Sequence, residues 1–161
     1  MEESSRDLGI LVDSSLRFHA HVRQIVAKAW GLVNSLLRST LCRSDEFMRG
    51  AFVAHIRLLL EFSSSVWNTG YLGDSELLES VQRRWTKHVD GISDLEYGDR
   101  LRRLNLYSVK GRLLRADLIK YYKIFNGLSV IFPRELFVMP PASHTRGHRF
   151  KVLKPLVSIE S

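Results

Sequence analysis

Basic side chains with aromatic side chains beside them are the residues of this sequence whose types and spacing point to a chemistry. Three groups have this pattern: residues 83–87, residues 107–115 and residues 146–151. Arginine and lysine bind phosphates, and exposed aromatic rings stack on nucleic-acid bases. The pattern therefore indicates nucleic-acid binding, with a solvated basic surface around an ordinary core as the alternative. Trp85 and Tyr122 lie on apolar stripes, and we expect both in the core.

The residue types that catalysis needs are present, but they do not form a catalytic pattern. A metal site for phosphoryl transfer needs converging carboxylates, whereas Asp45 and Asp74 stand at predicted helix starts. There is no glycine-rich phosphate loop, and Cys42 has no histidine at motif spacing. His144 and His148 are four apart but lack a third ligand. We therefore expect no catalytic residue, no metal ion and no cofactor.

The charge of the chain is concentrated in one segment. The 161 residues include 24 Lys and Arg against 17 Asp and Glu, which gives a net charge of +7. Residues 82–123 hold eleven Lys or Arg and five Asp or Glu, so most of the excess lies there. A balance of this kind favours nucleic acid or an anionic membrane surface as the partner.

Composition also indicates the class of protein and its compartment. The hydrophobic share of 45% and the aromatic share of 10% are typical of one globular domain. The single Cys42 excludes an internal disulfide and suits a reducing compartment. No segment is apolar over the length of a bilayer, and the polar N-terminus shows no targeting peptide. We therefore expect an intracellular protein, of the nucleus or the cytoplasm, with no membrane partner.

Hydrophobic periodicity predicts the helices that position the basic groups. Apolar residues recur at helical spacing over residues 16–38, and residues 47–62 are apolar almost all round, as in a buried helix. Val81, Trp85 and Val89 recur every fourth residue and form one face of the next helix. The first basic group therefore lies off the apolar face of this helix.

Cap residues indicate where the helices begin. Ser44 precedes one predicted helix, and Asp74 or Ser75 is expected to cap the helix that follows it. Ser93 and Glu96 have the form of a capping box, which predicts a short helix from that point.

A long helix is predicted from residue 108 to Gly127, which occupies the left-handed position that ends a helix. Its buried face is expected to hold Leu114, Leu118, Ile119, Tyr122 and Phe125. Arg112, Arg115 and Lys123 are expected to point away from that face.

The fold class predicted from these elements is mainly α. A short β-type run over residues 8–12 has no visible partner strand, so it is either an extended arm or the last strand of a sheet outside the chain. We predict a helical bundle of about five helices with a short N-terminal strand and an extended C-terminal arm. The predicted divisions are 1–15 for the tail and strand, 16–128 for the bundle, and 129–161 for a proline-containing loop and basic arm.

Several segments resemble one known family. Residues 78–87 (LESVQRRWTK) are similar to a signature found downstream of the polymerase core in non-LTR, LINE-type (jockey-like) retrotransposon reverse transcriptases. Other similar segments follow in the family's order: residues 8–13, residues 60–67, Tyr97 with Arg100 and Leu101, residues 104–119, residues 122–124, and residues 145–151. The resemblance covers nearly the whole chain, from Asp7 to Pro155.

The resemblance implies a thumb and post-thumb region without its polymerase core. In the family the catalytic aspartates lie on the palm, N-terminal to the matched region, and this chain has no Asp-Asp pair. The strand at residues 8–12 would then belong to the missing palm. The family's thumb grips the template–primer duplex, mostly through phosphates. Leu58, Trp85, Gly98 and Gly111 depart from the family pattern and suggest relaxed constraint.

We therefore expect a non-catalytic fragment of an RNA-directed DNA polymerase that contributes phosphate-backbone binding to RNA or an RNA–DNA template–primer. The residues expected to contact phosphates are Arg83, Arg84, Lys87, Arg112, Arg115, Arg146, Arg149 and Lys151. The alternative is a decayed or domesticated helical module with a structural or protein-interaction role. Such a module is expected to self-associate through exposed Leu8, Ile10 and Val12.

Overall fold

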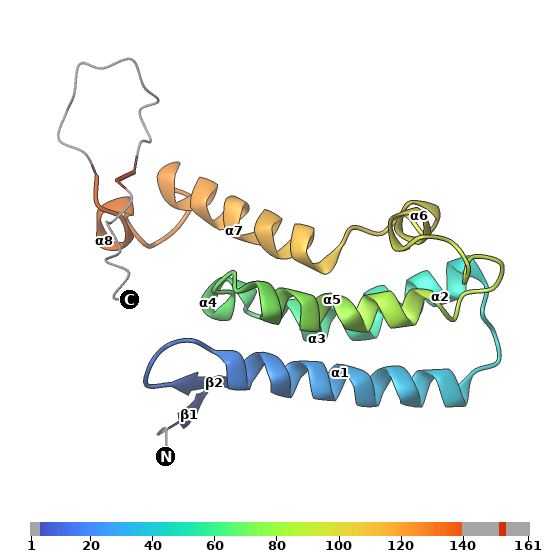
Figure 1. Cartoon of the computed structure of the whole chain (residues 1–161). Coiled ribbons are helices and arrows are strands. Elements are labelled where there is room, and N and C mark those ends of the chain that lie inside the picture. Colours follow the sequence, from blue (N-terminus) through green and yellow to red (C-terminus); the bar gives the residue numbers. More distant parts are fainter. Residues whose placement is uncertain (1–3, 140–151, 154–161) are drawn as a thin grey trace. The chain divides into compact units, whose positions relative to one another are not determined.

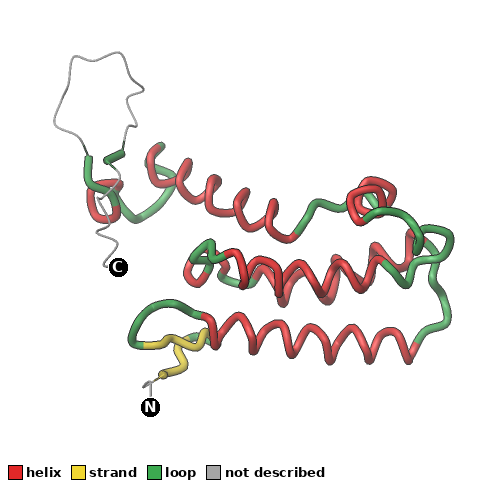
Figure 2. Tube along the Cα trace, in the orientation of Figure 1, coloured by secondary structure: helices red, strands yellow, loops and turns green. Residues whose placement is uncertain are grey.

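The structure, a computed structural model, describes residues 4–139 and 152–153 (Figures 1 and 2). It is mainly α-helical with a short β-hairpin at the N-terminus, which confirms the predicted fold class. The chain divides into two compact units, Met1–Asp117 and Leu118–Ser161, here called the first and the second unit. The predicted basic arm, with Arg146, Arg149 and Lys151, lies outside the described residues.

The first unit begins with a hairpin of strands β1 (Ser4–Asp7) and β2 (Ile10–Asp13), paired antiparallel. Leu8 and Gly9 form its two-residue turn, and both have positive φ angles, of 44° and 89°. Two positive φ angles in a two-residue loop match the type I′ turn, whose twist fits the twist of paired strands.

The hairpin changes two predictions. The predicted strand at residues 8–12 has its partner inside the chain, in β1, so the prediction that it lacks one is wrong. Ile10 is only 7% exposed because β2 packs on α1, whereas Leu8 in the turn is 87% exposed and Val12 is half-buried. The prediction that all three side chains are exposed is therefore wrong for Ile10, and self-association through Leu8 and Val12 stays a prediction.

Helix α1 (His19–Ser39) buries the predicted apolar stripe, which includes Val22, Val26 and Val33. It packs on α5 and on the π-helical segment η1. Asp13 organises the turn before α1, because its carboxylate accepts hydrogen bonds from the main-chain N–H groups of the three residues Ser15, Arg17 and Phe18.

A second helical run consists of α2 (Asp45–Ala51), the π-helical turn η1 (Phe52–Ile56) and α3 (Arg57–Glu61). Ser44 caps this run through its side chain, as predicted, with Ser44 Oγ accepting from the N–H of Phe47 at 3.4 Å. The prediction that residues 47–62 are buried all round is wrong at Phe47, Leu58 and Phe62, whose side chains are exposed. One short helix, α4 (Ser64–Trp67), follows.

Helix α5 (Leu72–Thr86) places Val81 and Trp85 in the core, which confirms the predicted stripe. The predicted caps are wrong, because α5 begins at Leu72. Asp74 instead lies in the first turn of α5. Its Oδ2 accepts a hydrogen bond from Nδ1 of His19 at 2.7 Å. This contact joins the beginning of α5 to the beginning of α1.

Helices α6 (Tyr97–Arg103) and α7 (Val109–Phe125) follow. The predicted capping box is wrong, because Glu96 is the N-cap of α6 and its side chain makes no capping hydrogen bond. Helix α7 belongs to the first unit as far as Asp117. In that part Val109 and Leu113 are buried.

The predicted buried face of α7 is largely wrong. Leu114, Leu118, Ile119 and Tyr122 are exposed, and only Phe125 of the five predicted residues is buried. Val109 and Leu113 are buried instead, and they lie on a different face of the same helix. They are four residues apart, a spacing that is as typical of a buried helix face as the predicted one.

The second unit holds the end of α7 and the short helix α8 (Pro133–Leu136). Phe125 stacks on Tyr121 and tilts against Phe137, with ring centroids 4.3 and 5.4 Å apart. Gly127 has a φ of +68°, and the N–H of Leu128 donates to the carbonyl of Lys123 at 2.8 Å, so the predicted glycine end of this helix is confirmed.

Candidate nucleic-acid interface

Three exposed cations lie at the end of α5, with Arg83 and Arg84 in its last turn and Lys87 at its C-cap. Arg83, Arg84 and Lys87 are exposed, while Trp85 between them is fully buried. The helical repeat of 3.6 residues explains this alternation, because Trp85 continues the apolar stripe and its neighbours fall outside it. The predicted cations therefore share one surface, here called the α5 cationic face and defined as Arg83, Arg84 and Lys87.

Two of these cations are held over aromatic rings of the neighbouring helices α1 and α6. The guanidinium carbon of Arg84 lies 5.2 Å from the ring centre of Trp30 on α1. The guanidinium carbon of Arg83 lies 5.2 Å from the ring centre of Tyr97 on α6. Cation–π contacts at such distances orient a guanidinium and leave its N–H groups available for phosphate oxygens. The face therefore presents two oriented arginines with Lys87 beside them.

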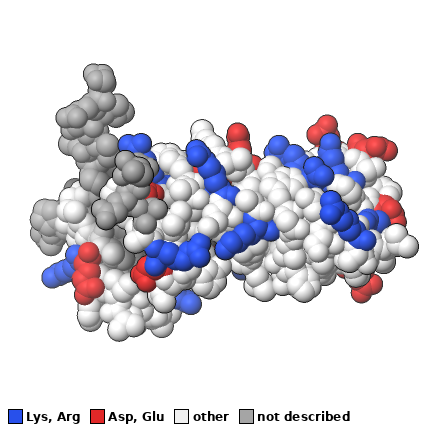
Figure 3. Space-filling model, turned by 90° about the horizontal axis from the view of Figure 1, so that it is seen from below, with Lys and Arg blue, Asp and Glu red and all other residues white. Residues whose placement is uncertain are grey.

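Helix α1, which packs on α5, carries further exposed cations. Residues 14–44 contain five Lys or Arg and no Asp or Glu. Among them Arg23, Lys28 and Arg38 are exposed on α1, which packs directly on α5. Figure 3 looks onto the side of the first unit on which α1 lies, and shows Lys and Arg side chains across it. These residues were not among the predicted phosphate contacts, although the long acid-free span was a usable signal.

Arg100, in contrast, is a buried structural residue. Its Nε donates to Oγ1 of Thr86 at 3.1 Å, and its Nη1 donates to the carbonyl of Leu95 at 3.1 Å. Its Nη2 donates to the carbonyl of Arg83 at 3.4 Å. A guanidinium that binds carbonyls at the end of a helix satisfies acceptors the helix leaves open. Arg100 therefore fixes the end of α5 and with it the position of the cationic face.

Glu79 joins α5 to α6 and α7. This carboxylate is buried, and it accepts hydrogen bonds from the hydroxyl of Tyr97 and from the main-chain N–H of Lys110, the latter at 3.0 Å. Burial raises the pKa of the Tyr97 phenol above its ordinary value, and the hydrogen bond to Glu79 adds to the rise. Tyr97 therefore stays neutral beneath the guanidinium of Arg83.

Arg112 is not a free surface cation, which argues against its predicted contact with phosphates. Its Nε and Nη2 donate to the two carboxylate oxygens of Glu61, with Nη2 to Oε2 at 2.7 Å. The hydrogen bond raises the pKa of Arg112, while burial lowers the pKa of Arg57, whose Nε lies 3.8 Å from the same carboxylate. Glu61 therefore holds Arg112 against α3. Arg115 is exposed on α7, as predicted.

Within residues 4–139 and 152–153, no three His, Cys, Asp or Glu side chains converge in a way that suits a metal ion. No helix in the same ranges combines the length and the apolarity that a membrane crossing needs.

The fold and the site together define a mainly α-helical unit with a cationic surface on two packed helices. No family model matches the chain, and no solved structure matches it. The chain is 25% identical over 124 residues to the uncharacterized protein B0403.1 of Caenorhabditis elegans. The match covers 75% of this chain and 63% of that protein, so the chain spans less than two thirds of its relative.

Proposed function

We propose that this chain is a non-catalytic part of a non-LTR retrotransposon reverse transcriptase that binds the phosphate backbone of RNA or of an RNA–DNA template–primer. The observation that carries the proposal is the α5 cationic face, with Arg83 and Arg84 held over aromatic rings on either side. Those two residues and Lys87 belong to residues 78–87, one of the ordered segments that resemble that family.

The geometry favours phosphates over other anions. A duplex presents phosphates at regular intervals along its surface, and a protein binds it by placing several cations in a row. Helix α1, which packs on α5, carries further exposed cations, so the charge available to a polyanion is not confined to one helix. The bound nucleic acid would be held through its backbone, without base recognition on this face.

We infer that the chain does not polymerise DNA by itself. Polymerisation needs carboxylates that hold divalent ions at the reacting phosphate, and the resemblance places those carboxylates in a palm that precedes the matched region. With magnesium, primer–template and deoxynucleotides, we expect no extension product from this chain.

A salt titration tests the proposed binding. Fluorescence anisotropy of a labelled RNA–DNA hybrid is measured between low and high salt for the unchanged chain and for the triple variant Arg83→Gln, Arg84→Gln, Lys87→Gln. We expect binding of the unchanged chain to weaken steeply with salt. The slope of log K against log salt concentration is expected to fall by about 2 to 3 in the variant, because up to three phosphate contacts are lost.

The matched control removes the same charge elsewhere. Arg6→Gln, Arg49→Gln and Arg134→Gln lie on β1, α2 and α8, and each side chain is exposed. This control is expected to keep a steeper slope than the cationic-face variant. Equal slopes for the two variants, or no binding by the unchanged chain at low salt, would contradict the proposal.

A further inference from the structure

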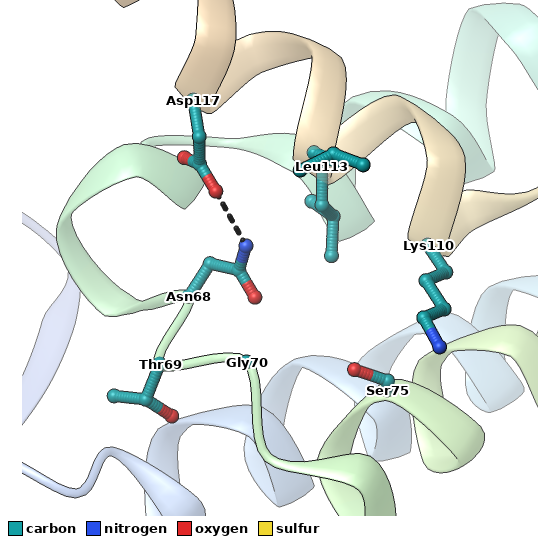
Figure 4. A pocket seen from close by; sticks show the side chains of 8 residues that line it. Asn68, Thr69, Gly70, Ser75, Lys110, Leu113 and Asp117 are labelled. Atoms are coloured by element: carbon teal, nitrogen blue, oxygen red, sulfur yellow. Dashed lines mark hydrogen bonds between the residues drawn. The ribbon is translucent and has the colours of Figure 1, made fainter. Parts of the chain in front are cut away.

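The first unit contains a cavity of about 310 Å³ beside α7. The loop between α4 and α5 and the beginning of α5 form one wall, and α7 forms the other (Figure 4). Its volume is at the lower end of the range for small-molecule sites, about 300 to 1,000 Å³. The cavity is separate from the α5 cationic face, since it shares no residue with Arg83, Arg84 or Lys87.

Helix α7 gives the cavity a cationic end and an anionic end. Lys110, Leu113 and Asp117 line it at i, i+3 and i+7, which is one face of a helix. Seven residues of helix separate the Cα atoms of Lys110 and Asp117 by about 10 Å. Leu113 lies between the two charged residues, so the middle of this wall is apolar.

The polar groups of the opposite wall match these two ends. Figure 4 shows Ser75 on the side of Lys110, and Asn68 on the side of Asp117. Nδ2 of Asn68 donates to Oδ2 of Asp117 at 2.8 Å, which fixes the carboxylate at the cavity. In the described part of the chain, the second carboxylate oxygen has no hydrogen-bond partner and the ammonium of Lys110 has no ion pair.

We propose that this cavity binds a guanine nucleotide, with the base at Asp117 and the phosphate at Lys110. An ionised carboxylate only accepts hydrogen bonds. The Watson–Crick edge of guanine presents two adjacent donors, N1–H and the N2 amino group, whereas the same edges of adenine, cytosine and uracil have no two donors side by side. Asp117 therefore suits guanine, the apolar wall of Leu113 and the more exposed Leu114 faces the ring, and Lys110 neutralises the phosphate with the hydroxyl of Ser75 beside it.

Nucleotide binding is measured by isothermal titration calorimetry with GMP, AMP, CMP, UMP and guanosine. GMP is expected to bind at least about tenfold more tightly than the other three nucleotides, the discrimination that a good bidentate contact gives. Guanosine is expected to bind more weakly than GMP, because it lacks the phosphate that Lys110 contacts.

Two variants separate the roles of the two ends. Asp117→Asn keeps an acceptor for Asn68 but replaces the second acceptor by a donor, so the preference for GMP over AMP is expected to disappear. Lys110→Gln is expected to reduce GMP affinity to that of guanosine and to leave guanosine affinity unchanged. Lys123→Gln, which removes an exposed lysine from the end of α7, is the charge-matched control and is expected to bind GMP normally.

Circular dichroism melting shows whether each variant is folded. If Asp117→Asn does not fold, Lys110→Gln still tests the proposal. Equal affinity for the four nucleotides overturns the proposal, and so does GMP affinity that neither variant lowers.

A short oligonucleotide with a terminal guanosine phosphate distinguishes the two sources of the ligand. Affinity similar to that of GMP assigns the cavity to a strand end, whereas exclusion of the oligonucleotide assigns it to the free nucleotide.

Discussion

The indole N–H of Trp85 donates a hydrogen bond of 3.0 Å to the main-chain carbonyl of Met48, and both side chains are fully buried. This bond joins the end of α5 to α2, one turn before the π-helical segment η1. The ring of Phe52 lies 6.4 Å from the ring of Trp85, centre to centre. Trp85 therefore fixes the position of the end of α5, where Arg84 and Lys87 also lie.

Replacing Trp85 by Phe tests that role. The variant keeps an aromatic ring but loses the donor and part of the volume, so we expect the free energy of unfolding to fall by about 1 to 3 kcal/mol. Urea unfolding followed by circular dichroism measures the loss. Trp30→Phe, at a half-buried ring, is the control and is expected to cost less. Equal losses in the two variants would show that the Met48 bond contributes nothing.

The helices of the core were predictable from the sequence because their apolar residues recur at 3.6-residue spacing. That spacing identified the buried stripe of α1 and the burial of Trp85. Periodicity does not show which neighbour covers a stripe, however. Helix α7 has apolar residues on two sides, and the side with Leu114 and Tyr122, which the sequence favoured, is the exposed one.

Other features were missed because they depend on residues far apart in the chain. Glu61, the partner of Arg112, stands 51 residues earlier, so no local pattern distinguishes Arg112 from the exposed Arg115. Strand β1 was missed because its sequence, SSRD, has neither apolar alternation nor β-branched residues. The candidate cavity was missed because Asn68 and Asp117 are far apart in the chain and meet only when it is folded.

The turn of the hairpin offers a stabilising substitution. Leu8 has a φ of 44°, a left-handed conformation that costs a residue other than glycine about 1 to 2 kcal/mol. Asparagine tolerates this conformation, and Asn-Gly is the preferred pair for a type I′ turn. We expect Leu8→Asn to raise the free energy of unfolding by about 0.5 to 1 kcal/mol, as measured by urea unfolding.

The control for this substitution is Leu41→Asn, the same change at a leucine that is also exposed but has no positive φ. It is expected to leave stability nearly unchanged, because no left-handed conformation is relieved. A loss of stability in Leu8→Asn would mean that the leucine side chain contributes more to the free energy of unfolding than the relieved turn conformation does.

The ion pair of Arg112 with Glu61 predicts opposite results for two arginines. Arg112→Gln is expected to lower the free energy of unfolding by about 1 to 2 kcal/mol, since the half-buried Glu61 loses its nearer partner. It is expected to change the affinity for an RNA–DNA hybrid little. Arg84→Gln is expected to weaken hybrid binding and to change stability little, because its side chain is exposed. Urea unfolding and anisotropy are measured on both variants, and hybrid binding weakened equally by the two would contradict the assignment.

The carboxylate of Asp13 predicts a loss of stability in acid. The hydrogen bond from the hydroxyl of Ser15, with further bonds from the main-chain N–H groups of Arg17 and Phe18, lowers the pKa of Asp13 from its ordinary 3.8 to about 2. Because the pKa is lower in the folded chain than in the unfolded one, the stabilisation is complete above pH 3.8 and is lost as the pH falls through about 2.

We expect Asp13→Asn to be less stable than the unchanged chain at pH 6, with the difference shrinking as the pH falls from 4 toward 2. Urea unfolding at pH 6 and at pH 2.5 measures this, with the exposed Asp90→Asn as the control. A difference between Asp13→Asn and the unchanged chain that is the same at both pH values would show that the carboxylate charge does not stabilise the turn.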